Sequence, residues 1–238
     1  MFGVNHSVST LLGDEMPYLL TVKCSCHTIH LVASYAAKCL PAELEDGLRA
    51  IYNHFSHSTA RRRDFTAFQV MEHQAKLKIL SPGQTRWLSL EACVWRIIEQ
   101  LNPLKAYFAE EYKDGKLASI KAVVDLLNHE LTFPFLHFVA YALNQLNEIN
   151  TQFQSESPQI HELKSEIHRL IKSFAKNFMN LRYVRGNESD PMKIDPLLTS
   201  QYVELNKIYL GKLQQKFIIF VLLDLTIILF NSIRSTYR

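Results

Sequence analysis

The chain has 238 residues, of which 47% are hydrophobic and 21% are charged, and its formal net charge is +3. This composition is typical of a globular protein and excludes a disordered, collagen-like or coiled-coil chain. The net charge alone is too small to indicate nucleic-acid binding. Seven glycines and eight prolines are few for a fold with many tight turns, so we expect a largely helical protein. Four cysteines, and a first segment that lacks a signal-peptide pattern, indicate a reduced intracellular protein rather than a secreted one.

The N-terminal region predicts two helices with a strand between them. Ser7 or Ser9 is expected to cap a short helix that ends before Pro17. The β-branched and apolar run at residues 18–24 predicts a strand, and helical spacing over residues 28–40 predicts a second helix. A single strand cannot form a stable sheet, so its partner strands are expected upstream of this sequence, unless the strand packs alone.

From residue 42 onward the apolar periodicity predicts helices almost continuously. The expected helices cover residues 43–56, a second segment that begins after residue 58, and residues 89–108, 117–127, 132–153, 159–183 and 201–209. In the second of these, Ser58 is the expected cap, and Phe65, Phe68 and either Val70 or Met71 are expected to be buried.

Proline and glycine mark the expected breaks in this helical region. Pro103 should kink the helix over residues 89–108 or divide it in two. The sequence Ser-Pro-Gly-Gln at residues 81–84 predicts a turn. Residues 185–200 contain two prolines and a glycine, and we expect an extended linker there.

The C-terminal segment, residues 217–230, is apolar except for Asp224 and Thr226. It is shorter than the roughly 20 apolar residues that span a bilayer, and it carries a carboxylate near its centre. We therefore favour a core helix whose partners lie in a missing portion, or a non-native end from a truncated gene model, over a membrane anchor.

One group of metal-ligand residue types occurs at the predicted junction of the strand and the second helix. It contains Cys24, Cys26, His27 and His30, and two thiolates with two imidazoles could complete a tetrahedral zinc site. Residues so close in sequence cannot all point at one ion at such a junction, and no second pair follows at zinc-finger spacing. Structural packing is the favoured interpretation, and no metal site is assigned.

Two groups of residues are candidates for nucleic-acid contacts. Arg86 and Trp87 follow a Pro-Gly turn, where the guanidinium could pair with a phosphate while the indole stacks on a base. Capping and core packing at the start of a helix explain the same residues. The other group is Arg61, Arg62 and Arg63, followed by Lys76 and Lys78, which suits phosphate contacts or a solvated helix face.

We find no catalytic constellation in the sequence. The acidic pairs fall on predicted helix surfaces, whereas a two-metal nuclease site needs acids that converge from separate elements. Neither a GxSxG, a P-loop nor a GxGxxG motif is present, and the ten histidines lack a suitably spaced nucleophile. We therefore expect no enzyme activity and no cofactor.

Several segments closely resemble hAT-superfamily transposases, in particular the zinc-finger and DUF4371-like proteins domesticated from them in animals. These segments are MFG at residues 1–3, HSVSTLL at 6–12, KCSCH at 23–27, LVASYA at 31–36, TRWLSLE at 85–91 and FQSE at 153–156. The resemblance covers roughly residues 1–210. Such proteins have a ribonuclease-H-like catalytic core that is interrupted by a large helical insertion domain.

The resemblance implies a mainly α fold, in which a helical insertion domain is attached to a fragment of a ribonuclease-H-like α/β core. Residues 1–41 would be the core remnant and residues 42–184 the insertion domain. Residues 185–200 would be the linker, and residues 201–238 a C-terminal helical segment with the apolar tail.

The resemblance also implies nucleic-acid-binding residues. The Cys-x-x-His of the family corresponds to Cys24 and His27, near the active site and the target DNA. The Arg-Trp of the family corresponds to Arg86 and Trp87, where the tryptophan would stack on a flipped base.

The family's three catalytic acids fall outside residues 1–238, as do its zinc-finger and dimerisation regions. The sequence therefore predicts a truncated, catalytically inactive, nuclear transposase-like protein that retains nucleic-acid binding, with DNA as its partner. The alternatives are a helical protein-interaction module, whose partner covers exposed apolar surface, and a non-functional gene remnant. A cytoplasmic location stays open, and a membrane partner is not expected.

Overall fold

The structure of the protein is a computed structural model that describes residues 7–16, 18, 24–37, 42–81, 90–113, 117–157 and 159–204. These residues are mainly helical, which confirms the predicted helical class. The α-helices of the described residues are α1 (Val8–Glu15), α2 (Ser25–Ala37), α3 (Ala42–Ser56), α4 (Thr59–Met71), α5 (Leu90–Glu99), α6 (Leu101–Tyr112), α7 (Ala118–Asn128), α8 (Thr132–Gln152), α9 (Leu163–Phe178) and α10 (Leu181–Gly186). Three short 3₁₀ turns complete the described part, η2 (Ile160–Glu162), η3 (Pro191–Lys193) and η4 (Thr199–Gln201).

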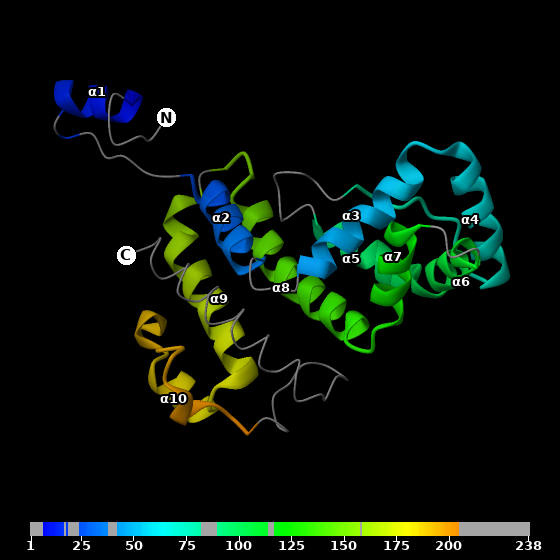
Figure 1. Cartoon of the computed structure of the whole chain (residues 1–238). Helices are drawn as coiled ribbons and strands as arrows, with labels where there is room; N and C mark the ends of the chain where they lie inside the picture. The colour runs from blue at the N-terminus through cyan, green and yellow to red at the C-terminus, as the bar shows by residue number, and fades with distance from the viewer. Residues whose placement is uncertain are drawn as a thin grey trace.

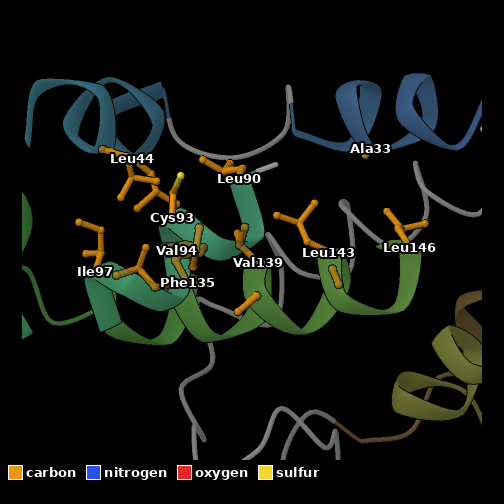
Figure 2. Close-up of a cluster of buried hydrophobic side chains, with 14 of the residues drawn as sticks. Ala33, Leu44, Leu90, Cys93, Val94, Ile97, Phe135, Val139, Leu143 and Leu146 are labelled. Atoms are coloured by element: carbon orange, nitrogen blue, oxygen red, sulfur yellow. The ribbon is translucent and has the colours of Figure 1, made fainter. Parts of the chain in front are cut away.

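Helix α8 is the longest described helix, and α5 and α2 pack along it (Figure 1). Leu90, Cys93, Val94 and Ile97 recur at spacings of three and four on α5, so they form one apolar face. Figure 2 shows this face against side chains of α8, with Ala33 of α2 and Leu44 of α3 at the edge of the same cluster. The predicted amphipathic character of this segment is thus the reason that α5 lies on α8.

Helices α3, α4, α6 and α7 gather at one end of the described structure (Figure 1). An aromatic cluster joins three of them, because Phe55 of α3, Phe65 of α4, and Tyr107 and Phe108 of α6 are all buried. The Phe55 and Phe65 rings are 4.9 Å apart, and the Phe55 and Tyr107 rings are 5.1 Å apart. These offset contacts hold α4 against the body of the fold.

Residues 179–204 pack against α9 at the other end. Met179 forms an isolated antiparallel bridge with Tyr202, and Ile194 is fully buried. The single helix predicted over residues 159–183 is wrong, because α9 ends at Phe178 and α10 begins at Leu181. The bridge takes Met179 out of helical geometry, and the chain turns there. The stretch expected as a linker, residues 185–200, contains η3 and part of η4.

The predicted helix caps are confirmed at two positions. The Ser7 hydroxyl accepts a hydrogen bond from the Thr10 amide, and the Ser7 amide donates one to the Thr10 hydroxyl. The Ser58 hydroxyl accepts one from the Arg61 amide. Burial of Val70 or Met71 is wrong, since both side chains face solvent at the C-terminal end of α4.

Pro103 divides the predicted helix over residues 89–108, as expected. Helix α5 ends at Glu99 and α6 begins at Leu101. The break precedes the proline because Pro103 has no amide proton to donate to the carbonyl of Glu99, and its ring crowds the preceding turn.

Several predictions fall on residues that the structure does not describe. They include residues 19–23 of the expected strand, the turn at residues 82–84, and residues 205–238 with the apolar segment 217–230. No strand occurs in the described parts of residues 1–41, so the ribonuclease-H-like fragment stays a proposal. Among the described helices, none is both long and apolar enough to cross a membrane.

Candidate nucleic-acid interface

Arg61, Arg62 and Arg63 lie in the first two turns of α4 and project in three directions, because successive helical residues are about 100° apart. Arg61 donates a hydrogen bond from Nη1 to the backbone carbonyl of His54, 3.2 Å away. Arg63 is exposed and lies 3.4 Å from the carboxylate of Asp64. Arg62 lines a pocket that contains neither Arg61 nor Arg63.

This pocket, which we call the α4 pocket, has a volume of about 250 Å³. Its lining comes from α3, from α4 and from the extended chain of residues 76–79. Three cationic side chains line it, those of Arg62, Lys76 and Lys78. The described lining contains no acidic residue, and neither Arg62 nor the two lysines form an ion pair with a described residue.

A tight turn after α4 returns the chain toward the pocket. His73 has a φ of 52°, in the left-handed region, and is the only described non-glycine residue with a positive φ. The Gln74 amide donates to the carbonyl of Gln69 at 2.8 Å, and the His73 amide donates to that of Val70 at 3.1 Å. This pair of bonds is the Schellman motif, which ends α4 and reverses the chain direction.

Two buried glutamines fix the returning chain in place. Gln69 Nε2 donates to the carbonyl of Leu77 at 2.8 Å and to Gln100 Oε1 at 2.7 Å. Gln100 Nε2 in turn donates to the carbonyl of Ala75 at 3.3 Å. The two side-chain amides hydrogen-bond to backbone carbonyls of the returning chain and to each other. Residues 75–77 are therefore held against α4 and the start of α6.

Both lysines of the segment that follows the turn line the α4 pocket and are exposed. Leu77 and Ile79 line the same pocket. Ile79 is buried, whereas Leu77 is half-buried. The ammonium groups thus flank the pocket that Arg62 reaches from α4.

The lining of the α4 pocket suits a phosphate group. Guanidinium and ammonium groups donate charge-assisted hydrogen bonds to phosphate oxygens. Ser56 and Thr66 also line the pocket, but their hydroxyls already donate to the backbone carbonyls of Asn53 and Arg62. Tyr52 adds an aromatic ring and a phenol. A cationic pocket with an aromatic neighbour is able to hold an anionic group next to a planar one.

A second polar pair lies beside this site, between α3 and α6. His54 Nε2 and the Tyr107 hydroxyl are 2.9 Å apart. Burial, and to a lesser extent the positive charge of Arg61, lowers the pKa of His54 to about 4, and burial also raises the pKa of Tyr107. The imidazole is therefore neutral at pH 7, and its Nε2 can accept the hydrogen bond that Tyr107 donates.

Cys24 and His27, the other described candidates, are both exposed at the start of α2. Between them Cys26 points inward, and its thiol donates to the carbonyl of Asn150 at 3.7 Å. Burial raises the pKa of this thiol. No group of three or more His, Cys, Asp or Glu side chains that could hold a metal occurs in the described part of the chain.

The structure brings together only some of the residues that the sequence indicated. Arg62, Lys76 and Lys78 share one pocket, whereas His27 lies on α2 and Cys24 directly precedes that helix. Arg86 and Trp87 lie outside the described residues.

Sequence reasoning missed the two glutamines that position the lysines. Gln69 follows Phe65 by four residues and so lies on the buried face of α4, which is the signal that could have identified it. Gln100 lies at the break between α5 and α6 that Pro103 was expected to cause, but no local pattern indicates that its side chain is buried.

No protein-family model, curated protein or solved structure matches this chain. The resemblance to hAT transposases therefore stays a prediction that depends on the quoted segments. The geometry of the α4 pocket is the independent basis for an argument about function.

Proposed function

We propose that this protein binds nucleic acid and that the α4 pocket holds a backbone phosphate. The observation that carries the proposal is the convergence of Arg62, Lys76 and Lys78 on one pocket whose described lining has no acidic residue. The two lysines reach it by a chain reversal that the glutamine pair secures. A cationic site built in this way attracts phosphates through charge, whatever the base sequence.

A polymer suits the surroundings of the pocket better than a small anion does. Arg61 and Arg63 are exposed on either side of Arg62, so a strand that crosses α4 could place further phosphates near them. Tyr52 offers a surface on which an unpaired base can stack. We infer single-stranded or locally unpaired DNA as the ligand class.

The family resemblance supplies the finer parts of the proposal. We propose that Arg86 and Trp87 contact a phosphate and an unpaired base, that residues 1–41 derive from a ribonuclease-H-like core, and that the protein acts in the nucleus. These statements rest on the quoted segments. The proposed role is binding, and no reaction is assigned to the chain.

The test is the binding of a fluorescein-labelled single-stranded oligonucleotide, measured by fluorescence anisotropy from about 50 mM to 200 mM salt. We expect the double variant Lys76→Gln/Lys78→Gln to bind about tenfold more weakly at low salt. The slope of log affinity against log salt should also decrease by about 1.4, because each phosphate contact to a single strand contributes roughly 0.7.

The matched control is Lys164→Gln/Lys176→Gln. It removes the same charge from two exposed lysines of α9, which form no ion pair with a described residue. This control should bind as the unmodified protein does. Equal losses in the two double variants would show that only net charge matters, and an unmodified protein that does not bind at low salt would also refute the proposal.

A further inference from the structure

A second and larger pocket lies on another face of the helical end, between α3, α7 and the start of α8. Its volume is about 720 Å³, within the range of roughly 300 to 1,000 Å³ that is usual for small-molecule sites. Buried apolar side chains form its inner wall, among them Leu44, Val123 and Phe135. We call it the α3–α7 pocket.

Small residues on both helices create this space. Gly47 and Ala50 of α3 and Ala122 of α7 line the pocket with little or no side chain. Leu126 packs directly over Gly47, so that a Cβ at Gly47 would lie only 2.1 Å from Leu126 Cδ2. Helices α3 and α7 are therefore in contact where Leu126 packs on Gly47, and the pocket is the space that the small side chains leave next to this contact.

The charged groups at this pocket are acidic. Glu43, Asp46 and Asp125 line it, and no lysine or arginine is among its described lining residues. The Asp125 carboxylate is bound by Lys121 on the same helix, at 2.5 Å. Glu43 and Asp46 are exposed, and no described residue forms an ion pair with either of them, so within the described structure two carboxylates lie unpaired beside an apolar cavity.

The remaining polar side chains do not offset this charge. Thr132 Oγ1 donates its hydrogen bond to the carbonyl of Leu126 at 2.6 Å. His129 Nδ1 accepts one from the amide of Leu131 at 3.2 Å. An apolar ligand that carries an anionic group would meet two carboxylates without a compensating cation, whereas a cationic group would be favoured.

We propose that the α3–α7 pocket binds an amphiphilic cation, a small molecule with an apolar body and a protonated amine. The apolar body would fill the space beside Gly47, Ala50 and Ala122. The ammonium group would lie at the edge, near Glu43 and Asp46. This site is separate from the α4 pocket and opposite in charge, so either proposal can fail without the other.

The experiment compares n-octylamine, n-octanol and n-octanoate, which share an alkyl chain and differ in charge, by titration calorimetry on the full chain at pH 7. We expect n-octylamine to bind at least tenfold more tightly than n-octanoate, with n-octanol between them. The variant Glu43→Gln/Asp46→Asn should remove most of the difference between amine and alcohol and leave the affinity for n-octanol unchanged. Equal affinity for the amine and the carboxylate would overturn the proposal.

A second pair of variants tests the location. Ala122→Leu places a larger side chain at the pocket, whereas Ala118→Leu makes the same change at another exposed position of α7 that does not line it. We expect Ala122→Leu to weaken n-octylamine binding at least fivefold and Ala118→Leu to leave it unchanged. Similar effects of both substitutions would mean that the amine binds elsewhere, and the proposal would be wrong.

Discussion

His54 is the described histidine whose environment most strongly opposes protonation. It lies among the rings of Phe55, Tyr107 and Phe108, with centroid distances from 5.0 to 5.5 Å. Burial lowers its pKa from 6.5 to about 4, and the nearby guanidinium of Arg61 acts in the same direction. When the chain unfolds, the imidazole regains water and its ordinary affinity for a proton.

This pKa difference predicts a pH-dependent stability. Between pH 6.5 and about 4 the unfolded chain binds more protons at His54 than the folded one, so the free energy of unfolding falls as the pH is lowered through this range. Above pH 6.5 His54 is neutral in both states and stability is at its full value. Protonation of the unfolded chain at lower pH reduces the free energy of unfolding by at most about 3 kcal/mol. Urea denaturation at several pH values measures it.

The variant His54→Gln should flatten this pH dependence, since glutamine can still hydrogen-bond to Tyr107 but does not titrate. Part of the slope should remain, because burial also lowers the pKa of His137 and His168. His57→Gln is the control, as His57 is exposed in the turn between α3 and α4. An unchanged slope in His54→Gln would contradict the assignment.

At the scale of elements, local sequence signals predicted where helices begin and how they face the core. Ser7 and Ser58 were identified as caps because a serine before an apolar periodic run can bind free backbone amides. The ends of helices were predicted less well. Met179 leaves helical geometry because it pairs with Tyr202, which is 23 residues away, and no local pattern records such a contact.

The end of α4 gives a prediction at this scale. His73 adopts a left-handed conformation that costs a non-glycine residue roughly 1 to 2 kcal/mol, because its Cβ crowds the following carbonyl. We expect His73→Gly to increase the free energy of unfolding by about 1 kcal/mol, with the Schellman hydrogen bonds retained. Chemical denaturation measures the change.

His57→Gly is the matched control, because His57 also lies in an exposed turn but has no positive φ. Glycine at position 57 relieves no backbone strain and increases the conformational entropy of the unfolded chain, so the free energy of unfolding should decrease slightly. If both glycine substitutions were to lower stability, the turn at His73 would not have the geometry described.

At the scale of the whole molecule, the sequence predicted the charges of the candidate site but not their arrangement. Arg62, Lys76 and Lys78 were identified as one basic group, although the turn at His73 and the Gln69–Gln100 pair that bring them together were not. The α3–α7 pocket was not predicted at all. It depends on the small residues of two helices that are about 70 positions apart in sequence, so periodicity within either helix gives no sign of it.

The last prediction concerns residues 185–204, of which residues 185–200 were expected to form a linker. Ile194 is fully buried and belongs to the main hydrophobic core, whereas Leu197, three residues later, is 64% exposed. The Val203 amide donates to the carbonyl of Phe178 at 2.9 Å, and the Asn180 amide donates to that of Gln201 at 2.7 Å. These contacts make the segment part of the cooperative fold.

Ile194→Ala should therefore lower the free energy of unfolding by about 2 to 4 kcal/mol, because it leaves a cavity against α9. Leu197→Ala removes a similar aliphatic side chain from the surface and should change stability by less than about 0.5 kcal/mol. Urea denaturation followed by circular dichroism compares the two variants. A flexible linker would tolerate both substitutions equally, so two small effects would mean that residues 185–204 do not pack as described.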